Sequence, residues 1–296
     1  MNSDLNEKRS HGIGAVGKTL PTALAVHDLS CLGKCSLTMV LPTLAASGVQ
    51  AIPIPTALLS TQTDGFEGYY FEELTEQMCK ISKHLCEDIK LSVDAIYTGF
   101  LGSAGQIDKV CDIIDSFAPP LVLVDPVMGD HGKLYSTYTK DMVVKMRELC
   151  KKADVITPNI TEACFLTGSD MLDVSGMTEK EAFEYASDIC KKLLPLGVKK
   201  IAITGLHYSN NVATYGYDRE KGEFIYSSGY VKCAYPGTGD MFASVLLGAL
   251  LNGSTFEEAS IKASNFTKKV IKYTSNFDTP VRNGVFFEPF LHELNK

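Results

Sequence analysis

The stretch PGTGDMFASVLLGALL, residues 236–251, joins a glycine-rich turn directly to an apolar helix. Two glycines flank Thr238 and let the backbone turn so that successive N–H groups point the same way. The helix that follows adds the positive end of its dipole, and such a site binds anions, typically phosphate. Asp240 is expected in the first turn, where a carboxylate can accept a proton from an attacking hydroxyl group. The alternative interpretation is an ordinary Asp or Thr helix cap after a glycine turn.

The chain before this stretch alternates short apolar segments with longer amphipathic ones. Repeated strand–helix order predicts an α/β fold with a central, mostly parallel sheet and helices on both faces, because parallel neighbours need crossover connections. The segments 210–218 and 222–231 predict a small antiparallel hairpin appended to that sheet. Other strands are expected at 22–28, 49–60, 94–100, 121–125, 154–158 and 199–205, and helices at 36–48, 71–89, 103–117, 139–151, 159–168, 178–194, 241–253 and 256–274.

The bulk properties of the 296 residues predict one globular domain over 21–296, preceded by a flexible amino-terminal extension over 1–20. A net charge of −7 argues against a nucleic-acid partner, which needs a concentrated basic face. The chain contains neither an apolar run of about 20 residues nor a secretory signal, so we expect no membrane partner and a cytoplasmic location. Nine scattered cysteines indicate reduced thiols.

The segment HGIGAVGKTLP, residues 11–21, contains a match to the phosphate-binding loop pattern between Gly12 and Thr19. A working loop of this type connects a buried strand to a helix. Residues 1–11 are too polar to form a core strand, and a predicted strand follows Pro21. We therefore interpret the match as a coincidence, while a nucleotide hydrolase that uses residues 12–19 stays as one alternative.

The GTGD motif before a long apolar helix, near the end of an α/β chain, resembles the signature of the ribokinase-like small-molecule kinases. Three further segments occur in the order of that family: YTGFLGSAGQ (97–106), VLVDPVMGDHGKLY (122–135) and DVITPNITEACFLTG (154–168). Over about residues 22–275 the chain is most similar to the vitamin B6 kinases, and residues 28–66 resemble their substrate-side segment. Hydroxymethylpyrimidine kinases usually carry a Gly-Gly-Ala-Gly type run after the first strand, where this chain reads SCLGKCSLT.

The resemblance implies ATP-dependent phosphorylation of the 5′-hydroxymethyl group of pyridoxal, pyridoxamine or pyridoxine. Gly237, Thr238 and Gly239 would form the anion hole, and Asp240 would be the general base. This agrees with the chemistry of phosphoryl transfer, which needs alignment and charge neutralisation more than covalent catalysis. Two alternatives stay open: a hydroxymethylpyrimidine (phosphate) kinase of thiamine biosynthesis and a catalytically inactive nucleotide-binding regulator.

The resemblance also implies Mg²⁺, held largely through water by Asp125 and Glu162, and leaves a monovalent cation such as K⁺ open. Without the family context, Asp125 is a strand-end turn former and Glu162 an acid in a helix first turn. Besides Glu162, nucleotide contacts are expected from Asn159, Thr204 and Gly205. Tyr135 matches a position in the loop that closes over ATP.

On the acceptor side, the resemblance places Asp28 and Thr56 against the pyridine ring. His27 would stack on the ring or bond to it, although a lone His at a strand end is more often a packed side chain. Cys31 and Cys35 are too few ligands for zinc. We also expect a homodimer, from the resemblance and because the prolines in the strand at 49–60 suit a sheet edge.

Overall fold

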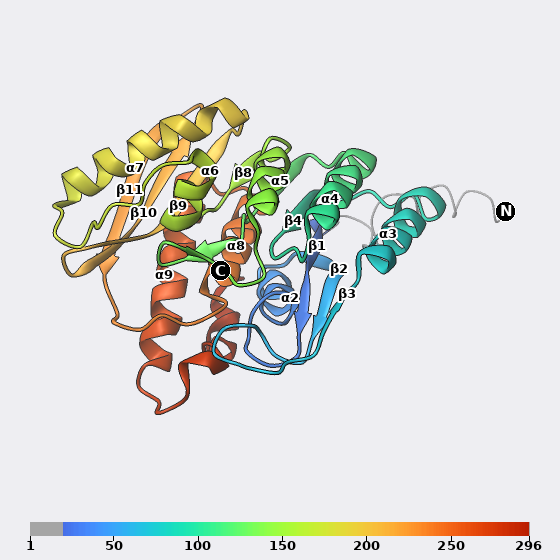
Figure 1. Cartoon of the computed structure of the whole chain (residues 1–296), viewed down its shortest axis with the longest axis horizontal. Helices are drawn as coiled ribbons and strands as arrows, with labels where there is room; N and C mark the ends of the chain where they lie inside the picture. Colours follow the sequence, from blue (N-terminus) through green and yellow to red (C-terminus); the bar gives the residue numbers. More distant parts are fainter. Residues whose placement is uncertain (1–19, 296) are drawn as a thin grey trace.

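The computed structural model describes residues 20–295, and within them a nine-stranded sheet runs through the molecule (Figure 1). Its order is β11-β10-β9-β8-β5-β4-β1-β2-β3, and the six strands from β9 to β2 are mutually parallel. The predicted hairpin, β10 and β11, adds antiparallel strands beyond β9. The strands are β1 Thr22–Ser30, β2 Gln50–Leu59, β3 Phe71–Glu73, β4 Ala95–Thr98, β5 Leu121–Val124, β8 Val155–Ile156, β9 Lys200–Tyr208, β10 Asn211–Asp218 and β11 Gly222–Gly229.

Helices cover both faces of this sheet, as the strand–helix alternation predicts. Figure 1 shows α3 to α7 along the upper side and α2, α8 and α9 along the lower side. Several helices begin at capping boxes, for example α7 at Thr178 with Glu181 and α9 at Thr255 with Glu258. The helices are α2 Leu37–Ala46, α3 Thr75–Lys83, α4 Ala104–Phe117, α5 Lys140–Cys150, α6 Ile160–Thr167, α7 Glu179–Leu193, α8 Thr238–Leu251 and α9 Phe256–Thr274.

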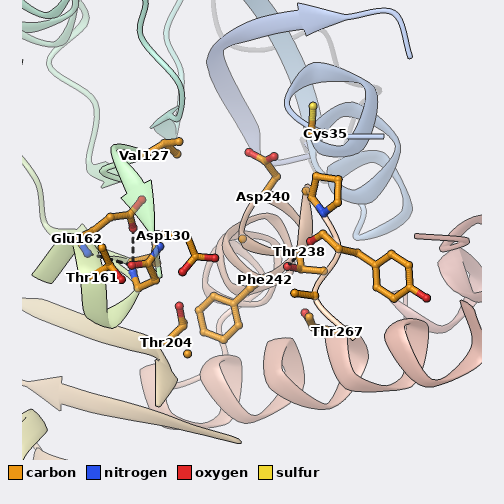
Figure 2. A pocket seen from close by; sticks show the side chains of 18 of the residues that line it. Cys35, Val127, Asp130, Thr161, Glu162, Thr204, Thr238, Asp240, Phe242 and Thr267 are labelled. Atoms are coloured by element: carbon orange, nitrogen blue, oxygen red, sulfur yellow. Dashed lines mark hydrogen bonds between the residues drawn. The ribbon is translucent and has the colours of Figure 1, made fainter. Parts of the chain in front are cut away.

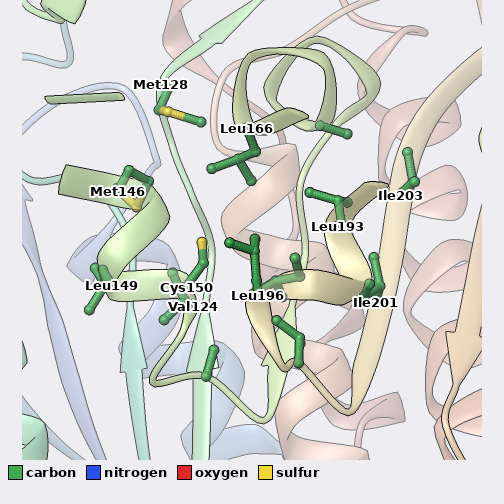
Figure 3. Close-up of a cluster of buried hydrophobic side chains, with 14 of the residues drawn as sticks. Val124, Met128, Met146, Leu149, Cys150, Leu166, Leu193, Leu196, Ile201 and Ile203 are labelled. Carbon is green, nitrogen blue, oxygen red and sulfur yellow. The ribbon is translucent and has the colours of Figure 1, made fainter. Parts of the chain in front are cut away.

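Two hydrophobic clusters form the core, one on each face of the sheet. In β1, Leu24 and Val26 face α3 to α7, whereas Ala23 and Ala25 face α2, α8 and α9. Figure 3 shows part of the first cluster, in which branched strand residues meet leucines from the helices. On the second face the strands supply mainly alanines, together with Tyr97 and Leu123, and α8 is buried from Met241 to Ala249. The prediction that this apolar helix packs on the sheet is therefore confirmed.

Three local expectations differ from the structure. Residues 71–89 do not form one helix: Phe71–Glu73 pair with Ala57–Leu59 as β3, α3 follows, and His84–Asp88 form a π-helical turn. At Phe71–Glu73 strand pairing replaces the helix that the apolar spacing predicts, because backbone hydrogen bonds to β2 satisfy the N–H and C=O groups of this segment. Because β3 lies outside β2, the strand at 49–60 is not itself the edge, although only its last three residues are covered. A two-stranded hairpin, β6 Gly129–Asp130 with β7 Lys133–Leu134, was not predicted.

Residues 1–19 lie outside the described residues, and with them almost all of the expected extension and the Gly12–Thr19 motif. Within residues 20–295, no helix has the length and apolar character needed to cross a bilayer. The carboxyl ends of the parallel strands open at one edge of the sheet. That edge is where ligands bind in open α/β sheets.

Candidate active site

A cavity of about 860 Å³ lies at the carboxyl ends of the strands, a volume within the usual range for small-molecule sites. Its walls come from segments far apart in the chain: the loop after β1, the ends of β5, β8 and β9, the hairpin β10–β11, the start of α8 and the second half of α9. Figure 2 shows Asp240 and Cys35 on one side, Glu162, Thr161 and Asp130 on the other, and Thr204 and Thr238 lining the space below them.

The glycine-rich turn lies at the start of α8, as predicted. Gly237 precedes the helix with φ 79°, a left-handed conformation that favours glycine. A Cβ atom there would lie 2.2 Å from the carbonyl oxygen of Lys34, so the position also excludes side chains sterically. Thr238 begins the helix and donates its hydroxyl hydrogen bond to the Tyr235 carbonyl at 3.0 Å. Gly237, Thr238 and Gly239 all line the cavity, with the helix N-terminus directed toward it.

Asp240 is in the first turn of α8 and is held by backbone groups. Its Oδ2 accepts a hydrogen bond from the Ser36 N–H at 2.9 Å, and its side chain is only 12% exposed. Burial raises the pKa of Asp240 to about 7, while the Ser36 N–H opposes this shift and the nearby charge of Asp28 adds to it. A carboxylate with a pKa near neutrality is matched to general-base catalysis.

Asp125 and Glu162 are two further buried acids that line the cavity. Burial raises the pKa of each well above its ordinary value, and the charge of Asp240 adds to the effect on Asp125, as that of Asp125 does on Glu162. Within residues 20–295, neither carboxylate forms an ion pair with a Lys, Arg or His side chain within 4.0 Å. Uncompensated buried carboxylates fit a divalent cation, which would favour their ionised forms.

Glu162 also has the structural position that its alternative interpretation implies, in the first turn of a helix. It completes the capping box of α6: its Oε2 accepts from the Asn159 N–H at 2.9 Å. Its Oε1 accepts from the Met128 N–H at 3.0 Å, which ties the loop after β5 to the helix. Asn159 caps the same helix through Oδ1 and donates from Nδ2 to the Gly129 carbonyl. Both polar ends of the Asn159 side chain are therefore engaged within the protein, although the residue lines the cavity.

Thr204 and Gly205 lie beside Asn159, and the three residues form one wall of the cavity. An isolated parallel bridge joins Asn159 to Thr204, and Gly205 has φ 72° where β9 continues past the cavity. The loop after β5 forms the short hairpin β6–β7, followed by Tyr135, whose N–H donates to the Met128 carbonyl. Tyr135 lines the cavity and is 37% exposed, a position that suits a residue in a closing loop.

Of the three residues expected on the acceptor side, only Asp28 lines the cavity. This residue is buried, lines the cavity and accepts a hydrogen bond from the Ser30 hydroxyl at 2.8 Å, and burial raises its pKa. Thr56 and His27 are fully buried and do not line the cavity, so direct contact with a ligand ring is not what the structure shows. The Thr56 hydroxyl instead donates at 3.1 Å to the carbonyl of Phe100, which lies just after β4.

The family model described as phosphomethylpyrimidine kinase matches residues 40–283, which include the end of β5, α6, β9 and the start of α8. The chain belongs to the phosphomethylpyrimidine kinase family. A solved structure assigned to the same enzymes, from Bacteroides thetaiotaomicron VPI-5482, is 37% identical, with a TM-score of 0.86 over 95% of this chain and 96% of that chain. The pyridoxal kinase of Lactobacillus plantarum is 28% identical, with a TM-score of 0.84 over 93% of this chain and 97% of that chain.

These structural relatives confirm the expected ribokinase-like fold of the family. Among curated proteins, a thiamine biosynthetic bifunctional enzyme of Oryza sativa subsp. japonica is 26% identical over 269 residues, or 89% of this chain. A pyridoxal kinase of Actinobacillus pleuropneumoniae is 28% identical over 200 residues, or 62% of this chain. The chain spans 46% of the length of the first of these relatives and 64% of the second.

Several residues of the site are not visible in the family motifs. Ser36 acts through its backbone N–H, for which no side-chain pattern exists. The thiol of Cys35 lines the cavity near Asp28 and Asp240, and burial raises its pKa well above the ordinary value.

All nine cysteines are free, and no cluster of metal-ligating residues is found in the described part of the chain. A further wall comes from β10, β11 and α9, with Val212, Thr214, Tyr226, Ser264, Thr267, Lys268 and Ile271.

Proposed function

We propose that this chain transfers the γ-phosphoryl group of ATP to the 5′-hydroxymethyl oxygen of a vitamin B6 vitamer, as a pyridoxal or pyridoxamine kinase. The observation that carries the proposal is the placement of Asp240, with its pKa of about 7, in the first helical turn after the Gly237–Gly239 turn. A base at the mouth of an anion-binding helix N-terminus is what transfer of a phosphoryl group to an alcohol requires. A second crystal form of the Bacteroides relative, also 37% identical, was solved with pyridoxal.

In the proposed reaction the alcohol oxygen forms a bond to the γ-phosphorus as the bond from that phosphorus to the β-bridging oxygen breaks. ADP leaves with the electron pair of the broken bond. Asp240 accepts the proton of the alcohol, and the amides of Gly237, Thr238 and Gly239 stabilise charge on the transferred group. Asn159, Thr204 and Gly205 form the proposed nucleotide wall, and Tyr135 with the β6–β7 hairpin would exclude water, which competes as acceptor.

Asp125 and Glu162 are the proposed Mg²⁺ ligands, largely through water, because both are buried acids without a cationic partner within residues 20–295. When bound, the ion supplies positive charge to the phosphates. Asp28 is the proposed polar contact of the acceptor ring, since it is the acid at the end of β1 that lines the cavity.

A hydroxymethylpyrimidine (phosphate) kinase is the second candidate function. It is favoured by the family model, whose description names phosphomethylpyrimidine, and by the rice relative, a thiamine biosynthetic enzyme. The two acceptors are heteroaromatic methanols of similar size. The same base and anion hole would therefore serve either, and only the acceptor wall discriminates them.

The deciding experiment compares turnover of the full chain with ATP and Mg²⁺ on pyridoxal, pyridoxamine, pyridoxine and hydroxymethylpyrimidine. We expect the highest kcat/KM for a B6 vitamer, and a clear preference for hydroxymethylpyrimidine would replace the first function by the second. Asp240→Asn should abolish turnover on every acceptor while ATP binding persists. Unchanged turnover in that variant would contradict the role of Asp240 as general base, and a wild-type chain that binds ATP without turnover would indicate an inactive regulator.

We also propose a homodimer. Outward-facing backbone groups of β3 and of the first half of β2 would then be covered by a second copy. Sedimentation at micromolar concentration checks this, and a monomeric mass there would contradict it.

A further inference from the structure

His27 is an unusual residue in the wall behind the active site. It lies in β1, is fully buried and does not line the cavity. Within residues 20–295, neither Nδ1 nor Nε2 forms a hydrogen bond of good geometry, although a backbone group of Tyr97 lies close enough to affect the pKa of the ring. Leaving buried ring nitrogens unsatisfied costs free energy, so a position of this kind calls for an explanation.

The residues packed around His27 hold its ring next to Asp240, the proposed base. Its Nδ1 lies 3.9 Å from Oδ1 of Asp240, which is about 1 Å longer than a hydrogen bond. The Tyr97 ring packs edge-on against it, with ring centroids 4.3 Å apart. Gly99 leaves room for the imidazole, because a Cβ at Gly99 would lie 2.3 Å from Nδ1.

His27 is neutral in this environment. Burial lowers the pKa of His27 to about 3, although a backbone group of Tyr97 opposes the shift. A neutral imidazole carries one N–H and one acceptor nitrogen. Asp28 from β1, Asp125 after β5, the Cys35 thiol and Tyr97 from β4 also lie near Asp240. The Tyr97 hydroxyl donates to the main-chain carbonyl of Asp240 at 3.4 Å, and Asp28 and Asp125 could donate to the Asp240 carboxylate only in their protonated forms.

We propose that His27 is a positioning residue for Asp240: it carries its proton on Nδ1 and donates a hydrogen bond to Oδ1 when the site closes on its substrates. Ser36 then holds Oδ2 and His27 holds Oδ1, which fixes the carboxylate plane while a lone pair stays free for the alcohol proton. Apo sites often have long catalytic hydrogen bonds that shorten in the Michaelis complex. This inference rests on the proposed role of Asp240, while His27 itself exchanges no proton with the substrate.

The test compares kcat in two variants. Which of the two is more active shows whether His27 acts through packing or through a hydrogen bond. His27→Leu fills the space without a donor, whereas His27→Asn is smaller but places an amide nitrogen where Nδ1 stands. We expect kcat to fall about tenfold or more in His27→Leu, with the KM for ATP unchanged, and to recover partly in His27→Asn. If the leucine variant is the more active of the two, or both keep the wild-type kcat, His27 is only a packed side chain and the proposal is wrong.

A second measurement does not depend on which alcohol is phosphorylated. The ¹⁵N shifts of the His27 ring in the full chain report which nitrogen carries the proton, with Asp240→Asn as the comparison. The proposal requires the Nδ1–H form in the wild type, and an Nε2–H form overturns it. A chain that phosphorylates none of the acceptors would contradict the proposed function, while these shifts would still decide the position of the proton.

Discussion

The N–H of Ser36 donates a hydrogen bond to Oδ2 of Asp240 at 2.9 Å, although 204 positions separate the two residues. The loop that brings Ser36 there has positive φ at Gly33, Lys34 and Ser36. Two of these three are not glycines, so the loop carries backbone strain, which is common at functional sites. The same loop places the Lys34 carbonyl against Gly237, which couples the start of α2 to the start of α8.

Gly237→Ala should disrupt this contact. Its φ of 79° and the 2.2 Å approach of a Cβ to the Lys34 carbonyl oxygen leave no room without moving backbone. We expect the free energy of unfolding to fall by about 2–4 kcal/mol and kcat by about 100-fold or more, since an anion-hole amide shifts. Gly253→Ala is the control, because it has φ 91° but no atom within 4 Å of the added Cβ. Urea denaturation and steady-state kinetics should separate the two variants; equal losses would refute the specific role of Gly237.

The pH dependence of kcat/KM should reflect Asp240. A general base acts in its ionised form, and the pKa of Asp240 is raised to about 7 by burial. Activity should therefore rise with pH through about 7 rather than through the range near 4 typical of an exposed Asp. A profile of kcat/KM against pH measures this. A flat profile between about pH 5 and 8 would show that another group limits the reaction on the acid side.

Asp240→Asn should raise stability at alkaline pH. Because the folded-state pKa lies above that of the unfolded chain, the stabilising contribution of protonated Asp240 is complete below about pH 4 and is lost as pH rises through about 7. Above that, the folded chain carries a buried charge that asparagine lacks. The gain should be at most about 4 kcal/mol near pH 8 and near zero at about pH 4, as thermal unfolding at both values can show. An equal effect at both values would contradict the raised pKa.

Glu162→Gln should weaken the response to Mg²⁺. The substitution removes one proposed ligand charge and places an amide nitrogen against a backbone N–H donor, from Met128 or Asn159. We expect about tenfold more Mg²⁺ for half-maximal activity. Glu258→Gln is the matched control, because Glu258 completes the exposed capping box of α9 with Thr255. It should lower the stability only slightly and leave the Mg²⁺ titration unchanged. Identical titrations in both variants would remove Glu162 from the proposed metal site.

Deletion of residues 1–19 should leave ATP affinity within about twofold of the full chain. The reason is that residues 1–11 are too polar to predict the core strand that must precede a phosphate-binding loop, and β1, not a helix, follows Pro21. Calorimetric titration with a non-hydrolysable ATP analogue measures the affinity. Loss of binding in the shortened chain would revive the nucleotide hydrolase alternative.

Much of the architecture could be predicted because periodicity is a local property. The parallel strands, the appended hairpin and most helices match the alternation of apolar segments, and the GTGD turn lies at a helix start. The prediction of one helix over 71–89 was wrong, since pairing of Phe71–Glu73 with β2 depends on a neighbour distant in sequence. The sequence singled out Asp125, Glu162 and Asp240 as candidate site residues. It did not show that all three carboxylates are buried close to one another.

The sequence by itself determined the order of the main strands and helices, the glycine-rich helix start, and the acids at strand ends and in first helical turns, because spacing and residue type encode them locally. It did not predict β3 or the β6–β7 hairpin. Only the tertiary structure decided which residues contact one another. The Ser36 N–H bonds to Asp240, and the Thr56 hydroxyl bonds to the Phe100 carbonyl. His27 lies outside the cavity lining, next to Asp240. Those outcomes depend on how β1, β4 and α8 pack together, and no local pattern specifies the side on which a buried ring will face.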